Sequence, residues 1–285
     1  RGSVAARMGL PVSGVVGFVS SYADGAHTSI PAPGLGALGA GRGGRSSRLA
    51  KALAALGVEA DDIALVSKHD TSTGANDPNE SELHTRLARA LGRSEGNSLV
   101  AVSQKTITGH AKGGAAVFQV AGLTEILASG VAPGNASLDV VDAPLAKDAF
   151  WVWPRKPIRL AGRGGEDGRV PGAGPVRAGL LTSLGFGHVS GLIAIVHPGA
   201  FEAALRQAAG QEAVEAWLTS ANARLAAGTR RRRAGMIGRA PLFEPVQGRR
   251  LGEESKQRDP HEVEAAMLLD PDARLGSDGV YHAGE

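Results

Sequence analysis

Residues 63–80 read "IALVSKHDTSTGANDPNE" and combine signals for a strand, a loop and a helix. The run IALVS has the length and composition of a buried strand, and it leads directly into His69. Asp77 is then a candidate N-cap, Pro78 suits the first helical turn, and Glu80 takes the third helical position of a capping box. The segment therefore predicts a strand, a loop that carries a histidine, and a helix, in that order.

Strand and helix segments alternate on both sides of this stretch. Further strands are predicted at residues 14–20 and 99–103, and residues 176–197 read as two strands joined by a glycine-rich turn. Apolar stripes predict the helices, and their members are Leu49, Leu53 and Leu56; Leu83, Leu87 and Leu91; and Val117, Val120, Thr124 and Leu127. Glycines that favour a left-handed C-cap follow the first two stripes. This alternation predicts an α/β fold with a largely parallel sheet.

The C-terminal part of the chain has a different character. An alanine-rich helix is predicted from residue 201 to about 228, and the sequence beyond 235 is irregular and polar. We therefore expect an α/β region over residues 1–200 and a helical and irregular extension over residues 201–285.

Composition narrows the possible classes of protein. The chain has 285 residues, a net charge of +3 and no cysteine, so disulfides and thiolate metal sites are excluded. No apolar run approaches the roughly 20 residues of a membrane span, and the first residues show no signal-peptide pattern, which favours a cytoplasmic protein. The basic run at residues 230–233 reads as a solvated helix end, and nothing behind it suggests a nucleic-acid reader.

Chemically useful side chains follow the predicted strands. His69 follows the strand at 63–67, and Lys105 and His110 follow the strand at 99–103. The glycine-rich turn "GFG" at 185–187 ends a third strand. Because reactive groups collect beyond the carboxyl ends of the strands in α/β sheets, we expect these groups to meet at one edge. A histidine at such a position can equally be a structural cap of the sheet edge.

Three motifs taken together resemble the β-ketoacyl synthases, the condensing enzymes of fatty acid synthesis. The motifs are the segment "HDTST" at 69–73, the segment "KTITGH" at 105–110, and the turn "GFG" at 185–187. Their contexts "ANDPNE", "LGRSEGN" and "GHAKGG" are similar to those of the type I fatty acid synthases of actinobacteria and fungi. The likeness covers about residues 10–200, and the segment "AAMLLDPDARLGSDGVY" near the end also resembles the actinobacterial synthases.

The resemblance implies the C-terminal half of a thiolase-like fold and a decarboxylative condensation of malonyl-carrier protein with an acyl-enzyme. His69 and His110 would hold the malonyl thioester oxygen and stabilise the enolate, with Lys105 as electrostatic support. Phe186 would be the gate, flanked by Gly185 and Gly187, and its backbone N–H would belong to the oxyanion hole of the acyl-cysteine step. The resemblance implies no cofactor and no metal in this chain, because the substrates arrive on the phosphopantetheine arm of an acyl carrier protein.

Two positions depart from the family pattern. Asp70 replaces the glycine of the first motif, which aspartate serves less well if the backbone needs a positive φ, and its charge would raise the proton affinity of His69. Gln119 stands where many stand-alone synthases carry a glutamate that pairs with the motif lysine, so the support of Lys105 must differ.

Other polar residues near the motifs have structural interpretations. Loop organisation is expected of Thr71, Ser72 and Thr73, and a surface position of Lys112. Three other histidines are expected to be structural or solvent-facing, and no spacing among them suggests a metal site. They are His84, His188 and His197.

The condensing reaction needs a thiolate, and the chain has none. We therefore expect a half of a condensing domain that is inactive alone, either a fragment of a longer chain or a separate subunit. Its partners would be the cysteine-bearing N-terminal half and an acyl carrier protein, within a homo-oligomeric enzyme and without nucleic acid or membrane. A non-catalytic subunit that shapes chain length is the alternative.

Overall fold

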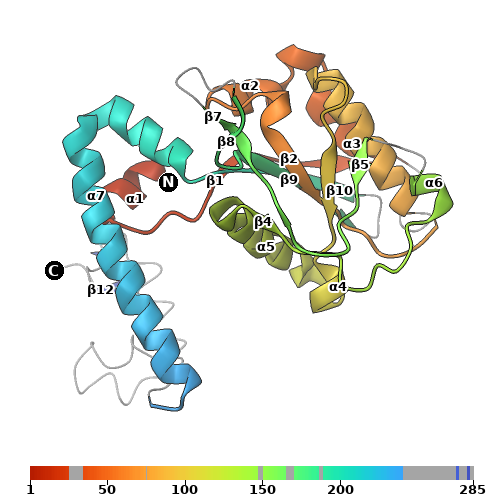
Figure 1. Cartoon of the computed structure of the whole chain (residues 1–285). Helices are drawn as coiled ribbons and strands as arrows, with labels where there is room; N and C mark the ends of the chain where they lie inside the picture. Colours follow the sequence, from red (N-terminus) through yellow and green to blue (C-terminus); the bar gives the residue numbers. More distant parts are fainter. Residues whose placement is uncertain are drawn as a thin grey trace. The chain divides into compact units, whose positions relative to one another are not determined.

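The computed structural model describes residues 1–25, 35–74, 76–146, 150–164, 170–185, 189–239, 274–275 and 281–282. The chain divides into two compact units: one comprises Val12–Gly210, and the other comprises Arg1–Pro11 with Gln211–Glu285. The predicted site residues belong to the first unit, which is built around one mixed sheet (Figure 1).

The central sheet has six strands in the order β1-β10-β9-β2-β3-β5. The strands are β1 (Val15–Ala23), β2 (Ile63–Ser67), β3 (Leu99–Val102), β5 (Trp151–Val152), β9 (Ala178–Gly185) and β10 (Val189–Val196). The neighbours β9, β2, β3 and β5 run parallel, whereas β1, β10 and β9 pair antiparallel. The predicted α/β class with a mixed, largely parallel sheet is therefore confirmed.

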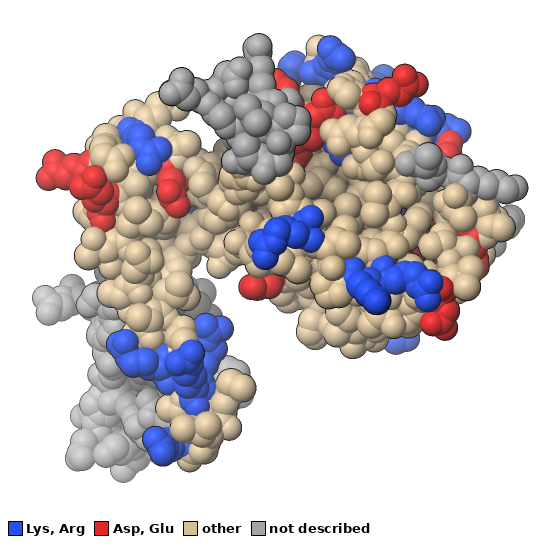
Figure 2. Space-filling view, viewed as in Figure 1, with Lys and Arg blue, Asp and Glu red and all other residues tan. Residues whose placement is uncertain are grey.

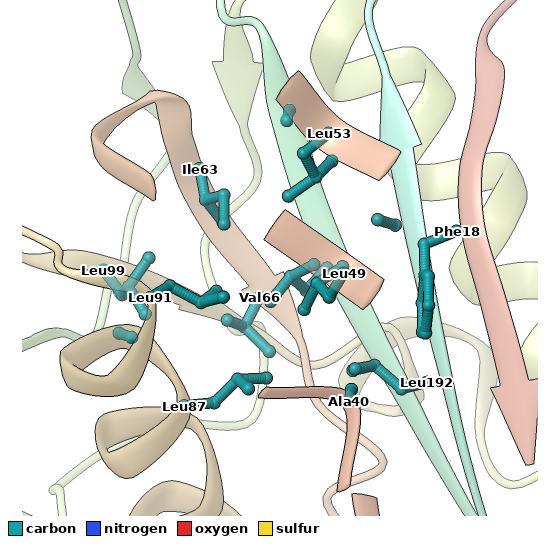
Figure 3. Close-up of a cluster of buried hydrophobic side chains, with 14 of the residues drawn as sticks. Phe18, Ala40, Leu49, Leu53, Ile63, Val66, Leu87, Leu91, Leu99 and Leu192 are labelled. Carbon is teal, nitrogen blue, oxygen red and sulfur yellow. The ribbon is translucent and has the colours of Figure 1, made fainter. Parts of the chain in front are cut away.

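Helices cover both faces of this sheet. In Figure 1, α2 (Arg48–Ala54) and α3 (Asp77–Leu91) lie on one face and α5 (Ala115–Ser129) lies on the other. The leucines of α2 and α3 pack with Phe18 and Val66 in the cluster drawn in Figure 3. A second cluster joins α5 to the opposite side of β2, β3, β9 and β10. The sheet is thus the middle layer of three.

Helix α3 confirms its predicted apolar stripe but begins differently from the prediction. Its buried stripe consists of Leu83, Leu87 and Leu91. The N-cap is Asn76 rather than Asp77, with Pro78 in the first turn, and Gly92 ends the helix in the left-handed conformation at φ 84°. Glu80 forms no capping box, because its carboxylate bonds to the loop that follows β2.

The buried face of helix α5 overlaps only partly with the predicted one. Leu127 is buried as predicted and Val120 packs against the core, but Val117 is 70% exposed, and Gln119 and Leu123 are buried. The other buried residues of the helix are Ala115 and Ile126. The helix is apolar around most of its circumference, so apolar residues recur at helical spacing on more than one face and the sequence does not show which face is buried. Burial of Gln119 is stabilised by hydrogen bonds from its amide nitrogen to backbone carbonyls.

Short elements fill the loops. Among the described residues, three further strand pairs are β4 (Val131–Ala132) with β6 (Ile158–Arg159), β7 (Gly162–Gly164) with β8 (Val170–Gly174), and β11 (Arg274–Leu275) with β12 (Tyr281–His282). The short helices are η1 (Leu35–Gly41), η2 (Gly44–Ser46), η3 (Ala60–Asp62), α4 (Lys105–Thr108), η4 (Lys112–Gly114) and α6 (Ala143–Ala146).

The C-terminal helix is longer than predicted. α7 spans Gly199–Met236 and is interrupted at Gly210, where φ is 86° and ψ is 174°. In the second unit, the indole N–H of Trp217 donates to the carbonyl of Leu10, which follows the unpredicted helix α1 (Gly2–Met8). None of the helices in the described part of the chain combines the length and hydropathy needed to cross a bilayer.

Candidate active site

Three adjacent parallel strands have their carboxyl ends side by side, and the loops that follow them lie at that end of the sheet. β9 pairs with β2, and β2 pairs with β3, all parallel, so their carboxyl ends are neighbours. His69 follows β2, whereas Lys105 begins α4 and His110 follows it, both after β3. Gly185 is the last residue of β9. Phe186 and Gly187, the predicted gate and its neighbour, lie outside the described residues, as does His188.

The structure brings His69, Lys105 and His110 together. The Nζ of Lys105 lies 3.2 Å from Nδ1 of His69 and also donates to the backbone carbonyl of His69. The rings of His69 and His110 stand edge to face, 5.5 Å apart between centroids. His69 is buried, Lys105 is half-buried and His110 is exposed. The site therefore has a fixed interior histidine and an accessible second one.

Hydrogen bonds to Nδ1 determine the tautomers of both histidines. Nδ1 of His110 accepts the backbone N–H of Lys112 at 3.0 Å. Nδ1 of His69 faces the ammonium of Lys105, which can only donate. In the neutral form each ring therefore carries its proton on Nε2. Each neutral imidazole therefore has one N–H donor, on Nε2.

The surroundings hold both imidazoles in the neutral form near pH 7. Burial lowers the pKa of His69 to about 4. The nearby charges of Lys105 and His110 also lower this pKa, whereas the charge of Glu80 raises it. The pKa of His110 is also lowered, by burial and then by the charges of Lys105 and Lys112. Asp70 therefore does not give His69 the raised proton affinity that the sequence led us to expect.

Glu80 is a site residue that the sequence assigned to a helix cap. Its side chain is fully buried, and its two oxygens accept the backbone N–H groups of His69, at 2.5 Å, and Asp70, at 3.0 Å. The hydroxyl of Thr182 donates to the same carboxylate, and the amide of Asn76 donates to it at 3.3 Å. This carboxylate from α3 fixes the backbone of the histidine loop.

Asp70 does adopt the backbone conformation that favours glycine. Its φ is +43°, and Ser72 is also in the left-handed region at +55°. The hydroxyls of Thr71 and Thr73 lie 3.3 Å apart, and Thr73 accepts the backbone N–H of Asn76. These bonds fit the expected loop-organising role of the hydroxyl residues. Asp70 also lines a cavity of about 460 Å³ beside the loop.

Gln119 supports the strand end and does not pair with Lys105. Its Nε2 donates to the carbonyls of Ser67, Lys68 and Thr182 at 2.9, 3.0 and 3.1 Å. The carboxylates whose charges raise the pKa of Lys105 are Glu80, Asp70 and Asp77, although burial lowers that pKa overall. The support of Lys105 thus comes from α3 and the histidine loop.

The other described histidines have structural surroundings. His84 is fully buried, its Nε2 lies 3.0 Å from the Thr182 hydroxyl, and burial, with the charge of Lys68, lowers its pKa to about 3. Nδ1 of His197 accepts the backbone N–H of Gly199. Within the described ranges, no three acidic or imidazole side chains are grouped so as to hold a metal ion. Arg230–Arg233 are exposed on α7, where Figure 2 shows lysine and arginine gathered.

Near the site, α5 exposes apolar side chains to solvent. Val117 is 70% exposed and Phe118 is 46% exposed, although both lie in the first turns of the helix that follows His110. Large exposed apolar groups that lie close together mark interaction surfaces in soluble proteins.

Strands β1 and β10 expose further valines on the same side of the sheet as α5. Val16 stands opposite Ile195 and Val19 opposite Ile193, and both isoleucines pack in the core cluster beneath α5. Paired residues share a face, so these valines, 61% and 63% exposed, point toward the α5 side. Val189 alternates onto the same face and is 48% exposed.

Comparisons with known proteins agree with this arrangement. Residues 13–139 match the family described as "Beta-ketoacyl synthase, C-terminal domain". The chain is 34% identical over 281 residues to "Fatty acid synthase 2" of Mycosarcoma maydis, covering 98% of this chain and 7% of that protein. It is 40% identical over 154 residues to "Fatty acid synthase subunit alpha" of Saccharomyces cerevisiae, covering 54% of this chain and 8% of that protein. The chain thus spans under a tenth of these two relatives.

A solved structure shows the same fold. The ketosynthase FabY from P. aeruginosa superimposes with a TM-score of 0.68 at 23% identity, covering 85% of this chain and 35% of that one. The predicted thiolase-like fold is therefore confirmed.

Proposed function

Because residues 13–139 form a β-ketoacyl synthase C-terminal domain, we propose that this chain supplies the malonyl-binding half of a condensing active site. The observation that carries the proposal is the pair of neutral imidazoles, His69 and His110. In each ring Nδ1 faces a donor, so the proton lies on Nε2, where it can be donated to a substrate. The reaction would be that of a 3-oxoacyl-carrier-protein synthase, an acyltransferase of fatty acid synthesis.

The two N–H donors suit the decarboxylation step. When the malonyl group loses carbon dioxide, the electron pair of the broken carbon–carbon bond forms an enolate whose thioester oxygen becomes negative. Donors already in place stabilise that oxygen without reorganisation, which is the usual basis of such catalysis. Lys105 would act as a positioning residue, because its ammonium holds Nδ1 and the carbonyl of His69.

The second step needs an acyl group held on a cysteine thiolate, which this chain does not contain. The enolate carbon attacks an acyl thioester, a new carbon–carbon bond forms, and the thiolate leaves. No cysteine occurs in the 285 residues, so we propose that a cysteine-bearing N-terminal half provides the acyl-enzyme and that this chain alone does not condense. The malonyl group would come from an acyl carrier protein, and we expect the full enzyme to be a homo-oligomer.

The exposed apolar residues offer a place for the missing half. We propose that it packs over α5 and over the adjoining face of β1 and β10, covering Val117, Phe118, Val16, Val19 and Val189. Burial of such groups contributes about 25 cal/mol per Å² of apolar surface. Val117 and Phe118 lie in the first turn of the helix that follows the His110 loop, so a contact there would bring a cysteine toward the histidines.

Reconstitution tests the proposed function. The chain is assayed alone and together with a cysteine-bearing N-terminal half of a ketoacyl synthase, joined ahead of Arg1 or added as a second chain. Release of carbon dioxide from malonyl-carrier protein and formation of the 3-oxoacyl product are both measured. We expect product only with both halves, and a His110→Ala assembly serves as the inactive control. Product from the chain alone, or none from any assembly, would contradict the proposal.

The absence of cysteine also fits a non-catalytic partner subunit that shapes chain length. Such a subunit would support condensation at a complete active site elsewhere. In that case His110→Ala would leave the rate unchanged and alter only the length of the products, which mass spectrometry of the acyl chains would detect.

A further inference from the structure

Lys68 is a buried charge that the proposed chemistry does not use. Its side chain has no exposed surface, and its Nζ lies 3.3 Å from Oδ1 of Asp70 and 4.8 Å from the ring centroid of Trp153. A lysine ammonium is almost never buried completely unless it is paired. Asp70 is therefore the partner that permits this interior position.

Asp70, in turn, occupies a backbone conformation that costs an L-residue free energy. Its φ of +43° is left-handed, and the family motif that the loop resembles carries glycine there. The backbone N–H of Asp70 is held by Glu80, and its carboxylate is held by Lys68. The turn is thus fixed at its backbone and, independently, at its side chain.

His69 lies between the two members of this ion pair. Lys68 is tied to the end of β3 by its backbone N–H, which donates to the carbonyl of Val102 at 3.0 Å. The side chains of Lys68 and Asp70 bind each other, so the residues on both sides of His69 are linked and its backbone is constrained. The imidazole of His69 meets Lys105 and His110, whereas the ion pair reaches Trp153.

We propose that Lys68 and Asp70 act as one positioning unit for His69: the buried ammonium allows a carboxylate at the left-handed position, and the pair fixes where the imidazole points. The proposal rests on the proposed function of His69 in malonyl decarboxylation. Neither residue touches the reacting atoms, so both are positioning residues.

The pair must be complete to serve this purpose. Other charged or titratable groups that face His69 are Glu80 of α3, Lys105 of α4, and His110 of the following loop, and Asp77 of α3 faces Asp70. Asp77 also faces Lys68. Loss of Lys68 alone leaves two neighbouring carboxylates without their ammonium, and loss of the Asp70 charge alone leaves the buried ammonium without the carboxylate that lies 3.3 Å away. Both losses disturb the loop, but they change the local charge in opposite directions.

A double-mutant cycle in the assembled synthase tests the unit. The variants are Lys68→Met, Asp70→Asn and the combination, since asparagine tolerates the left-handed conformation and differs from aspartate in charge. Lys51→Met, on the exposed side of α2, is the matched control. The rate of malonyl decarboxylation is measured well below the melting temperature of each variant. The environment of the His69 ring is followed by NMR with histidine labelled at Cε1.

We expect each single variant to lose about tenfold in the decarboxylation rate and the double variant to return to within about threefold of the parent, a coupling typical of neighbours in contact. The Cε1–H resonance of His69 should shift in each single variant and return toward its parent position in the double variant. Additive losses in rate, or additive changes of the His69 resonance, would overturn the proposal. If the parent assembly does not decarboxylate, the proposed function fails, and the coupling between the two changes of the His69 resonance still decides whether the pair is a unit.

Discussion

The imidazole rings of His69 and His110 meet edge to face, with 5.5 Å between their centroids and 83° between their planes. One ring comes from the loop after β2 and the other from the loop after α4, and the parallel pairing of β2 with β3 brings these loops together. Each ring accepts a hydrogen bond at Nδ1, or faces a donor there, so each neutral ring carries its proton on Nε2.

Replacement of His110 by alanine should separate the two steps of the reaction. Removal of one preorganised donor usually costs about 10²–10³ in rate, so malonyl decarboxylation should fall by that factor. Acyl loading of the partner cysteine should fall far less, because it does not use this donor. Both rates are measured on the same assembled protein. Equal losses in the two steps would mean that the substitution disrupts the site as a whole.

Replacement of Glu80 by glutamine should loosen the histidine loop. Glutamine offers one acceptor where two are needed, and its NH₂ group would face a backbone N–H of His69 or Asp70. Leaving a buried donor unpaired costs about 1–3 kcal/mol, so unfolding by urea should require less denaturant. The decarboxylation rate should fall as well. Glu82→Gln, exposed on the same helix, is the control and should change neither quantity.

Stability should fall as the pH is lowered below 6.5. The folded pKa values of His69 and His84, about 4 and about 3, lie below the ordinary value of 6.5. The unfolded chain therefore binds more protons between pH 6.5 and about 4, and stability is lost as pH falls through that window. Each histidine contributes up to about 1.4 kcal/mol per pH unit.

Urea unfolding at several pH values, with His84→Gln beside the parent, measures this dependence. The variant removes one titrating group, so its stability should change less steeply with pH. An unchanged slope would show that His84 is not held neutral in the fold.

Replacement of Arg93 by lysine should destabilise the chain by about 2–4 kcal/mol, because several buried or partly buried carbonyls would lose their donor. The Arg93 guanidinium donates to the carbonyls of Ala60, Ile63, Asn97 and Ser98 at 2.6–2.9 Å. It thereby joins the start of β2 to the turn before β3. Arg86→Lys, at an exposed ion pair with Glu82, should cost much less stability. Equal losses of stability in the two variants would show that the carbonyl contacts of Arg93 do not stabilise the fold.

Replacement of Phe118 by serine should weaken binding of the cysteine-bearing half. The phenyl group is already 46% exposed, so its loss should change the stability of this chain little. Titration of the two halves as separate chains should show an affinity at least about tenfold lower, the usual effect of losing a buried aromatic contact. Leu225→Ser, exposed on α7, is the matched control. Unchanged affinity for Phe118→Ser would place the interface elsewhere.

The strands, and the end of the sheet at which the histidines lie, could be predicted from the sequence. IALVS and LVAV are short apolar runs with a single good interpretation, and β2 has the predicted bounds. Helix α3 was equally clear because its leucines recur at one period and polar residues fill the other positions. Local pattern is sufficient where it has one good interpretation, such as a short continuous apolar run for a central strand or a single apolar stripe for a helix.

The supporting contacts could not be predicted in this way. Glu80 satisfied a local capping pattern, but its carboxylate serves two N–H groups eleven and ten residues earlier. Helix α5 is apolar on several sides, so the buried face depends on which surface meets the sheet. Burial of Lys68 depends on Asp70, two residues further on, and on Trp153, far along the chain. In each case the deciding contact exists only in the folded chain and leaves no periodic pattern in the sequence.

The pairing of β1 with β10 has a consequence for how the chain folds. Val15 lies opposite Val196, so the first strand of the sheet joins its neighbour across most of the first unit's sequence. Contacts of such high sequence separation form slowly, because the loop-closure entropy must be overcome first. During synthesis β1 leaves the ribosome long before β10 exists. The core of β2, β3, α2 and α3 can assemble in that interval, and β1 can add to the sheet only after the β9–β10 hairpin has been made.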